Sequence, residues 1–317
     1  MKTLIDFDGA AIVAVPVASG FGEDGARECM LLEGPQGWGE FSPPRNAGHD
    51  ATVRWLTAAV EPGTVGWPDP VRGRVPVAVR VPAVAPADAH RLVVESGCGT
   101  ADVAVGAGRI GDDVARVEAV RDALGPRGAI RCDAGGAWDA DTAASAVSRL
   151  AAAAGGLQYV VEPCSTATES TQLRLRTDVP IAVLVRAGAA DLAATADVLV
   201  LVPGTLGGVR RALRVAEASG LPCVAGSGLE TSVGMSAAAA LAGALPALPY
   251  ACPIGRPAWL LGDVVADGRT LVPHDGHLPV APMPPGPDPT RLAEYAVTDP
   301  ERLAWWRHRL LAAQAAL

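Results

Sequence analysis

The chain has 317 residues, of which 50% are hydrophobic, and its formal net charge is −8. This length and composition suit one large buried core with a smaller appended domain. The acidic balance offers no basic surface for nucleic acid, and no apolar stretch reaches the roughly 20 residues of a membrane-spanning helix. Six cysteines lack the paired spacing of zinc sites, so we expect free thiols in a reducing cytoplasm.

The first 75 residues show the pattern of a small α+β domain. Alternating apolar residues predict three strands, at 13–16, 28–32 and 37–41. A glycine-rich connection at 19–25 joins the first two. Asp50 is expected to cap a helix that extends to about residue 60. We therefore predict one domain over residues 1–75.

From about residue 75, short apolar segments alternate with helical segments rich in alanine and arginine. Eight strands are expected, at 75–81, 101–105, 129–133, 159–162, 181–185, 198–202, 223–226 and 250–253. Helices are expected between most of them, including 112–124, 141–153, 206–218 and 231–241. This alternation predicts a parallel barrel over residues 76–275. A proline-rich linker and a last helix within 276–317 are expected to pack back on the first domain.

Three stretches together resemble one known family. They are GWGEFSP at 37–43, RCDAGGAW at 131–138, and LGGV at 206–209 with LETSVG at 229–234. They resemble the actinobacterial o-succinylbenzoate synthases, which are dehydratases of menaquinone biosynthesis in the enolase superfamily. The resemblance extends from about residue 13 to 265. It implies an α/β, enolase-like fold: an N-terminal α+β capping domain and a (β/α)7β modified TIM barrel, with the site at the carboxyl ends of the strands.

The resemblance also implies a chemistry. Members of the family use a Lys-x-Lys pair on the second barrel strand, a lysine on the sixth, and three carboxylates that bind Mg²⁺. The very weakly acidic proton next to a carboxylate requires a neutral base, and the resulting enediolate requires a divalent cation. Lys2, however, is the only lysine in this chain.

Carried over residue by residue, most of these groups are absent. The lysine positions fall on Asp102, Ala104 and Val202. Of the metal ligands only Asp133 is retained, and the other two positions fall on Val161 and Leu184. Arginine cannot serve as a base near neutral pH, and one carboxylate alone does not hold Mg²⁺. We therefore predict no functional Mg²⁺ site and no cofactor.

Three charged residues remain as catalytic candidates on the inward face of the predicted barrel. Asp102 and Asp133 occupy inward positions, and strand alternation places Arg186 on the face of the lost ligand two residues before it. We expect Arg186 to pair with Asp133 or Asp102 in place of the cation, either for function or as a structural ion pair. Arg131, two residues before Asp133, is a candidate for substrate binding.

Other candidates for substrate binding lie near the strand ends and on loops. Glu162 follows a lost metal position, and only a bulge would turn it inward. The backbone N–H groups at 230–232 predict either an anion site with Ser227, Glu230 and Thr231, or a capping box in which Ser227 precedes Glu230 by three residues. Three capping-domain residues are also expected near the barrel mouth: Phe21, Arg45 and His49.

The residues support three functions. The first is a repurposed, metal-independent enzyme that cyclises, dehydrates or isomerises a bulky, largely apolar small molecule in specialised metabolism, with Asp133 or Asp102 as the acid. The second is a non-catalytic protein that binds a small molecule or a partner. The third is o-succinylbenzoate synthesis itself, which the resemblance favours and the missing groups oppose. We expect a small-molecule ligand, no nucleic acid and no membrane, and leave a homo-oligomer open.

Overall fold

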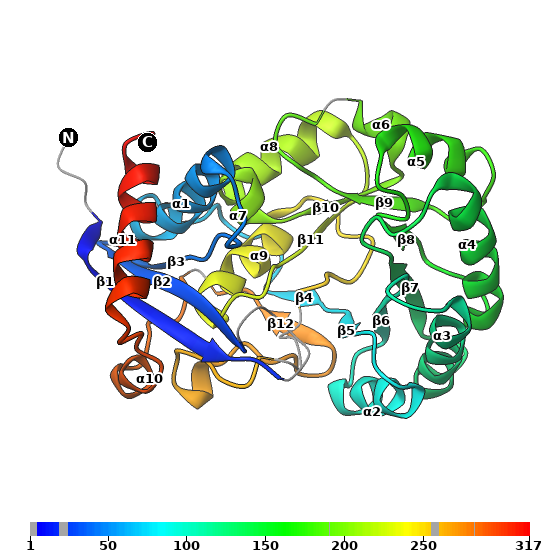
Figure 1. The fold of residues 1–317 in the computed structure, drawn as a ribbon, viewed down its shortest axis with the longest axis horizontal. Coiled ribbons are helices and arrows are strands. Elements are labelled where there is room, and N and C mark those ends of the chain that lie inside the picture. Colours follow the sequence, from blue (N-terminus) through cyan, green and yellow to red (C-terminus); the bar gives the residue numbers. More distant parts are fainter. Residues whose placement is uncertain (1–4, 19–24, 190, 255–259, 282) are drawn as a thin grey trace.

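Two units lie side by side in the computed structural model, which describes residues 5–18, 25–189, 191–254, 260–281 and 283–317 (Figure 1). One unit is a three-stranded antiparallel sheet with helices packed on it. The other is a curled sheet of seven parallel strands with helices around the outside. The fold is therefore the enolase-like capping domain and barrel that the sequence predicts.

The capping sheet contains the three predicted strands. These are β1 (Asp6–Pro16), β2 (Ala26–Gly34) and β3 (Gly37–Phe41), in the order β1-β2-β3. Helix α1 (His49–Thr64) packs against them. Its N-cap is Gly48 and not Asp50, so that prediction is wrong. Asp50 lies in the first turn, where a negative charge complements the helix dipole.

The barrel sheet runs in chain order, with each strand parallel to the next. Its strands are β5 (Val79–Val81), β6 (Thr100–Ala104), β7 (Ala129–Asp133), β8 (Val160–Val161), β9 (Ile181–Leu184), β10 (Val198–Leu201) and β11 (Cys223–Ala225). The helices are α2 (Pro86–Ser96), α3 (Ile110–Leu124), α4 (Ala140–Ala154), α5 (Ala167–Arg174), α6 (Leu192–Thr195), α7 (Pro203–Leu206), α8 (Val209–Ser219) and α9 (Ser232–Ala244). Outward side chains such as Val103 are fully buried under these helices, so the alternate residues, including Asp102, face inward.

Three predicted elements differ from the observed ones. The strand expected at 75–81 is split, because β4 (Arg74–Pro76) turns away to pair with β12 (His277–Pro279). The segment expected as the eighth strand forms one parallel bridge, between Cys252 and Val77. The helix expected at 206–218 is interrupted by Gly207 and Gly208, both of which have a positive φ.

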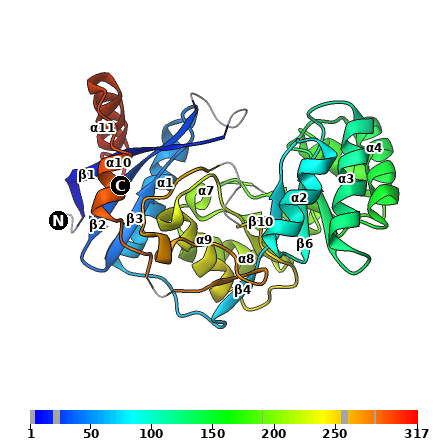
Figure 2. The same ribbon diagram turned by 90° about the horizontal axis from the view of Figure 1, so that it is seen from below.

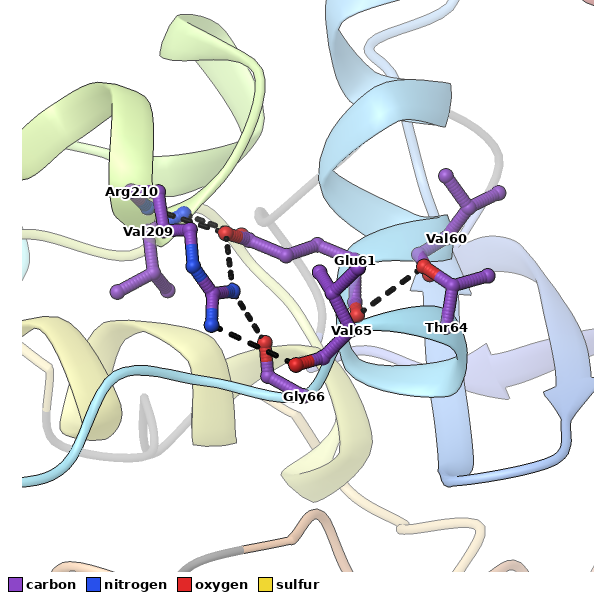
Figure 3. Close-up of polar contacts among 7 residues, drawn as sticks. All are labelled: Val60, Glu61, Thr64, Val65, Gly66, Val209 and Arg210. Carbon is purple, nitrogen blue, oxygen red and sulfur yellow. Dashed lines mark hydrogen bonds and ion pairs between the residues drawn. The ribbon is translucent and has the colours of Figure 1, made fainter.

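The capping domain and the barrel are joined through Glu61 on α1 (Figure 3). Its carboxylate accepts hydrogen bonds from the backbone N–H groups of Val209, at 2.5 Å, and Arg210, at 3.1 Å. Arg210 also pairs with it through Nη1 at 3.3 Å. A carboxylate at the first N–H groups of α8 complements the helix dipole, so Glu61 caps a barrel helix from another domain.

The end of the chain returns to its beginning. Beyond the short helix α10 (Pro289–Glu294), helix α11 (Pro300–Gln314) lies against the capping domain and contacts α1 (Figures 1 and 2). Its fully buried Trp306 packs edge-on against Phe41, and the indole Nε1 donates to Glu28 Oε2 at 2.7 Å. In the part of the chain that the structure describes, no helix is long and apolar enough to cross a membrane.

Candidate functional site

The carboxyl ends of the barrel strands surround a cavity of about 460 Å³. Trp55 of the capping helix α1 and the loop residues Pro44 and Leu229 also line it, so the cavity lies between the two domains. Its strand-end lining includes Val161, Leu184, Val200 and Val202, together with the charged residues Arg80, Asp102, Arg131, Asp133, Glu162 and Arg186. We call it the barrel-mouth cavity.

Arg80 on β5 joins the two predicted catalytic acids. Its Nη1 lies 3.0 Å from Asp102 Oδ2 and 2.6 Å from Asp133 Oδ2. Burial lowers the pKa of Arg80, but the two carboxylates outweigh burial and raise it above its ordinary value. The group formed by Arg80, Asp102 and Asp133, which we call the Arg80 clasp, therefore holds a permanent cation.

Strand register explains the clasp. Arg80 is directly opposite Asp102 in the β5–β6 pairing, and Asp102 is opposite Arg131 in the β6–β7 pairing. Arg80 was not among the site residues predicted from the sequence, although it lies within the strand expected at 75–81. Alternation along that strand would have placed it on one of the two faces, but only the alignment between strands places it beside Asp102.

The predicted pairing of Arg186 with Asp133 or Asp102 is wrong. Arg186 Nη1 pairs with Glu162 Oε2 at 3.2 Å, and its side chain is 68% exposed. The physical reason is that β9 ends at Leu184. Beyond that residue the backbone is no longer a strand, so alternation does not fix which way Arg186 points.

Glu162 lines the barrel-mouth cavity, but no bulge turns it there. It directly follows the last residue of β8 and has a left-handed φ of +43°, which is uncommon for a residue other than glycine. Its Oε1 accepts a hydrogen bond from the backbone N–H of Leu184 at 2.7 Å. The Glu162 carboxylate therefore lies beside the backbone of Leu184, which is one of the positions where the family resemblance expects a metal ligand.

Arg131 lies at the floor of the cavity and is fully buried. Its Nη1 donates to the hydroxyl of Tyr159 and to the carbonyl of Ala251, the latter at 2.8 Å. Among the described residues, neither Nε nor Nη2 of Arg131 has a partner, and Asp102 Oδ1 has none either. These atoms are enclosed by the protein, so they are polar groups without a hydrogen-bond partner beneath the cavity wall.

The turn before α9 differs from both predictions. Thr231 is the N-cap, so the capping box of Ser227 and Glu230 is wrong. The anion site is wrong as well, because the N–H of Thr231 already donates to Glu40 Oε2 at 3.0 Å and the next N–H donates to Asp263. Ser227 lines the barrel-mouth cavity, whereas Glu230 and Thr231 are buried away from it.

Of the three candidates from the capping domain, the two that the structure describes do not line this cavity. Phe21 lies outside the described residues. His49 is the first residue of α1 and is exposed, and it is not among the described residues that line the barrel mouth. Arg45 lines a smaller neighbouring cavity, where its Nη2 pairs with Glu28 Oε1 at 3.2 Å.

The residues present do not fit the Mg²⁺ that the family resemblance implies. Of the three ligand positions, Val161 and Leu184 offer no side-chain oxygen. The Asp133 carboxylate accepts from Arg80 through Oδ2 and from the N–H of Gly135 through Oδ1, at 3.0 Å. Within the described ranges, no three His, Cys, Asp or Glu side chains gather as a metal site. The absence of Mg²⁺ from the reaction stays a prediction.

Comparisons with known proteins agree with the fold. The enolase C-terminal domain-like family matches residues 85–287, and the enolase N-terminal domain-like family matches residues 12–63. The solved structure of an enolase from Mycobacterium smegmatis, complexed with tartrate, superposes with a TM-score of 0.77 at 20% identity, over 93% of this chain and 92% of that one.

Comparisons of sequence are more specific. The o-succinylbenzoate synthase of Thermobifida fusca is 47% identical over 96% of this chain and 95% of its own length. The o-succinylbenzoate synthase of Mycobacterium ulcerans is 39% identical over 96% of this chain and 93% of its own. With the capping domain, the barrel and the barrel-mouth cavity described above, these matches show that the chain belongs to the o-succinylbenzoate synthase family of the enolase superfamily.

Proposed function

We propose that the barrel-mouth cavity binds a small, largely apolar molecule and converts it without Mg²⁺. The observation that carries this proposal is the Arg80 clasp. Its guanidinium holds Asp102, at a position where the family resemblance expects a lysine, and Asp133, at a position where it expects a metal ligand. A fixed cation at this place compensates two acids but cannot remove a proton from a substrate.

The charges around the cavity support a ligand with little net charge. In the part of the chain that the structure describes, three arginines and three acids line it, so their formal charges cancel: Arg80, Arg131, Arg186, Asp102, Asp133 and Glu162. The family arrangement of three lysines and a divalent cation against three carboxylates would carry two net positive charges. Such a site favours a dianion, whereas a neutral cavity with an apolar wall favours an uncharged or singly charged molecule.

Asp102 is the residue best placed to act on a bound ligand. As a salt-bridged carboxylate it is a hydrogen-bond acceptor, and Oδ1 has no partner among the described residues. The buried guanidinium of Arg131, on the neighbouring strand, adds a positive charge beneath the cavity. Confinement of a ligand against the Asp102 side chain and the apolar wall suits cyclisation, dehydration or isomerisation. Asp133 would then position Arg80.

A second candidate function is o-succinylbenzoate synthesis. The 47% identity to the Thermobifida fusca protein that carries this name favours it. Against it stand the single lysine of the chain, Lys2, and the apolar residues at two metal positions. A third candidate, binding without turnover, is compatible with the same cavity.

The test is a dehydration assay on the purified full chain with the substrate of o-succinylbenzoate synthase. The assay is run with excess Mg²⁺ and with EDTA, and the Thermobifida fusca relative serves as the positive control. We expect no metal-dependent product from this chain. Product formed at a rate near that of the relative and abolished by EDTA would overturn the proposal in favour of the second candidate.

A second measurement separates turnover from binding. Native mass spectrometry of the purified chain identifies any small molecule that co-purifies with it, and that molecule is then supplied as substrate. We expect turnover that Asp102→Asn reduces by roughly 100-fold or more, as for loss of an acid–base group. A ligand that is recovered unchanged under all conditions would support the non-catalytic protein.

A further inference from the structure

A second cavity, of about 180 Å³, adjoins the barrel-mouth cavity on the side of the capping domain. Pro44 and Leu229 line both cavities and so separate them. Its lining also includes Arg27 of β2, Arg45 of the loop after β3, and Trp306 of α11. We call it the annex cavity. None of the Arg80 clasp residues lines it.

Among the described residues, arginines outnumber acids around the annex cavity. Glu28 Oε1 pairs with Arg45 at 3.2 Å, and Glu28 Oε2 pairs with Arg302 at 2.7 Å. Arg27 and Arg309 have no carboxylate within ion-pair distance among the described residues. Among the described residues, two arginines and one acid line the annex cavity, namely Arg27, Arg45 and Glu28, and Arg302 and Arg309 lie just outside this lining.

Arg27 is fixed in place by backbone carbonyls. Its Nε donates to the carbonyl of Leu229 at 3.0 Å, and its Nη2 donates to the carbonyl of Ser42. Within the described part of the chain, Nη1 makes no hydrogen bond. A guanidinium held in one orientation by two bonds loses little entropy when its remaining donors bind a ligand.

Arg309 shows that the positive charges repel one another. Burial lowers its pKa, and the nearby charges of Arg27 and Arg302 lower it further. Arg309 Nη1 and Arg302 Nη2 are buried and have no hydrogen-bond partner among the described residues, although both guanidinium groups lie over the ring of Trp305. An added negative charge would relieve this repulsion.

Two acids behind Arg27 offset part of the charge. Burial raises the pKa of Glu40 and of Glu230, and the nearby positive charge of Arg27 opposes this rise. The pKa of Glu40 is raised to about 7, so together the two acids carry less than two full negative charges near neutral pH. The annex cavity therefore retains a positive excess.

We propose that the annex cavity is a binding site for an oxyanion, namely the phosphate or carboxylate group of a small metabolite. Guanidinium groups suit both anions because their planar donors match two oxygens at once. A cavity of about 180 Å³ has room for one phosphate or carboxylate group and the atoms bonded directly to it. The inference does not rest on the proposed function, because the Arg80 clasp takes no part in it.

The experiment is calorimetric titration of the full chain at pH 7 and constant ionic strength. Inorganic phosphate and acetate are titrated separately, which distinguishes the two oxyanions, and chloride is the blank. We expect one saturable site for at least one of them. Arg27→Gln should weaken binding by about tenfold or more, because it removes a charge-assisted contact. Arg176→Gln, in an exposed ion pair with Asp141, is the matched control and should leave binding unchanged.

Arg45→Gln keeps the test informative if Arg27→Gln does not fold, because it leaves the carbonyl contacts of Arg27 in place. It too should weaken binding severalfold, with thermal unfolding used to verify the fold. Asp102→Asn should have no effect. The proposal is overturned if no saturable binding occurs, if the folded annex variants bind as the wild type does, or if Asp102→Asn strengthens binding, which would place the anion in the barrel mouth beside Arg80.

Discussion

Arg80 compensates two of the acids of the barrel mouth through a single nitrogen atom. Nη1 contacts both Asp102 and Asp133, and the Asp102 side chain is only 4% exposed. A buried carboxylate without a counter-charge is costly, so the stability of this region depends on one guanidinium.

Arg80→Met should therefore lower the free energy of unfolding by about 2–3 kcal/mol, less than for a fully buried pair because the Arg80 side chain is 30% exposed. Urea denaturation measures the change. Arg186→Met is the control, and its exposed pair with Glu162 should contribute less than about 1 kcal/mol. Addition of Asp102→Asn to Arg80→Met should restore part of the loss. Equal effects of the two arginine substitutions would contradict this account.

Strand alternation predicted the inward positions of Asp102 and Asp133, because both lie within regular strands. The same reasoning failed for Arg186, which lies beyond the end of its strand. The left-handed backbone of Glu162 has no signal in the sequence, since such conformations persist only through surrounding structure. Asp102 and Asp133 were therefore predictable, whereas Arg80, whose partner depends on the alignment between strands, and Glu162 and Arg186, which lie beyond strand ends, were not.

At the scale of elements, α1 packs closely on the segment that follows β10. A β-carbon at Gly204 would clash with the ring of Trp55, and one at Gly208 would clash with Glu61 Oε2. The glycine pair of the LGGV motif at 206–209 is expected from the sequence to allow close packing of a strand and a helix, and the second glycine has a more specific role. The structure gives that role: it admits a capping-domain carboxylate to the first N–H groups of α8.

Gly208→Ala should lower the free energy of unfolding by about 1–3 kcal/mol, because its φ of +117° strains any other residue and the added carbon displaces Glu61. Gly111→Ala is the matched control. Gly111 lies exposed in α3 with open space around it, so alanine there should stabilise the helix by up to about 1 kcal/mol. Thermal and denaturant unfolding measure both. A neutral Gly208→Ala would mean that Glu61 does not depend on this contact.

At the scale of the whole molecule, Glu40 of the capping domain joins the N-terminus of α9 in the barrel. Its Oε2 accepts from the N–H and hydroxyl of Thr231 and from the N–H of Gly234 at 3.2 Å. Burial, and next the charge of Glu230, raise the pKa of Glu40 to about 7. This contact between the domains should therefore respond to pH.

The free energy of unfolding should fall as pH rises from about 4.5 to about 7 and then level off. In that window the folded state holds a proton on Glu40 that the unfolded chain has released, and the full effect is up to about 3 kcal/mol. Glu40→Gln should reduce this slope to the part that Glu230 contributes, whereas Glu95→Gln, on an exposed side chain of α2, should keep it. Denaturant unfolding at pH 5 and pH 8 tests both variants. The same slope in Glu40→Gln and the wild type would assign the effect to other groups.

The two-domain plan was predictable from the sequence for two reasons. The spacing of apolar residues changes near residue 75, and the family motifs follow one another in the expected order along the chain. The contacts between the domains were not. Glu40 and Thr231 are 191 residues apart, and Glu61 and Val209 are 148 apart. No local pattern specifies such pairs, because they form only when the barrel has placed its helices against the cap.

The return of α11 to the capping domain has a consequence during synthesis. Trp306 completes a hydrophobic cluster with Met30, Leu32 and Phe41, so the first sheet stays without its last helix while the barrel is made. At about 5–20 residues per second, a ribosome needs about 13–50 s to proceed from Phe41 to Pro300. For that time the nascent sheet exposes an apolar face, which makes it a natural client for chaperones that act on emerging chains.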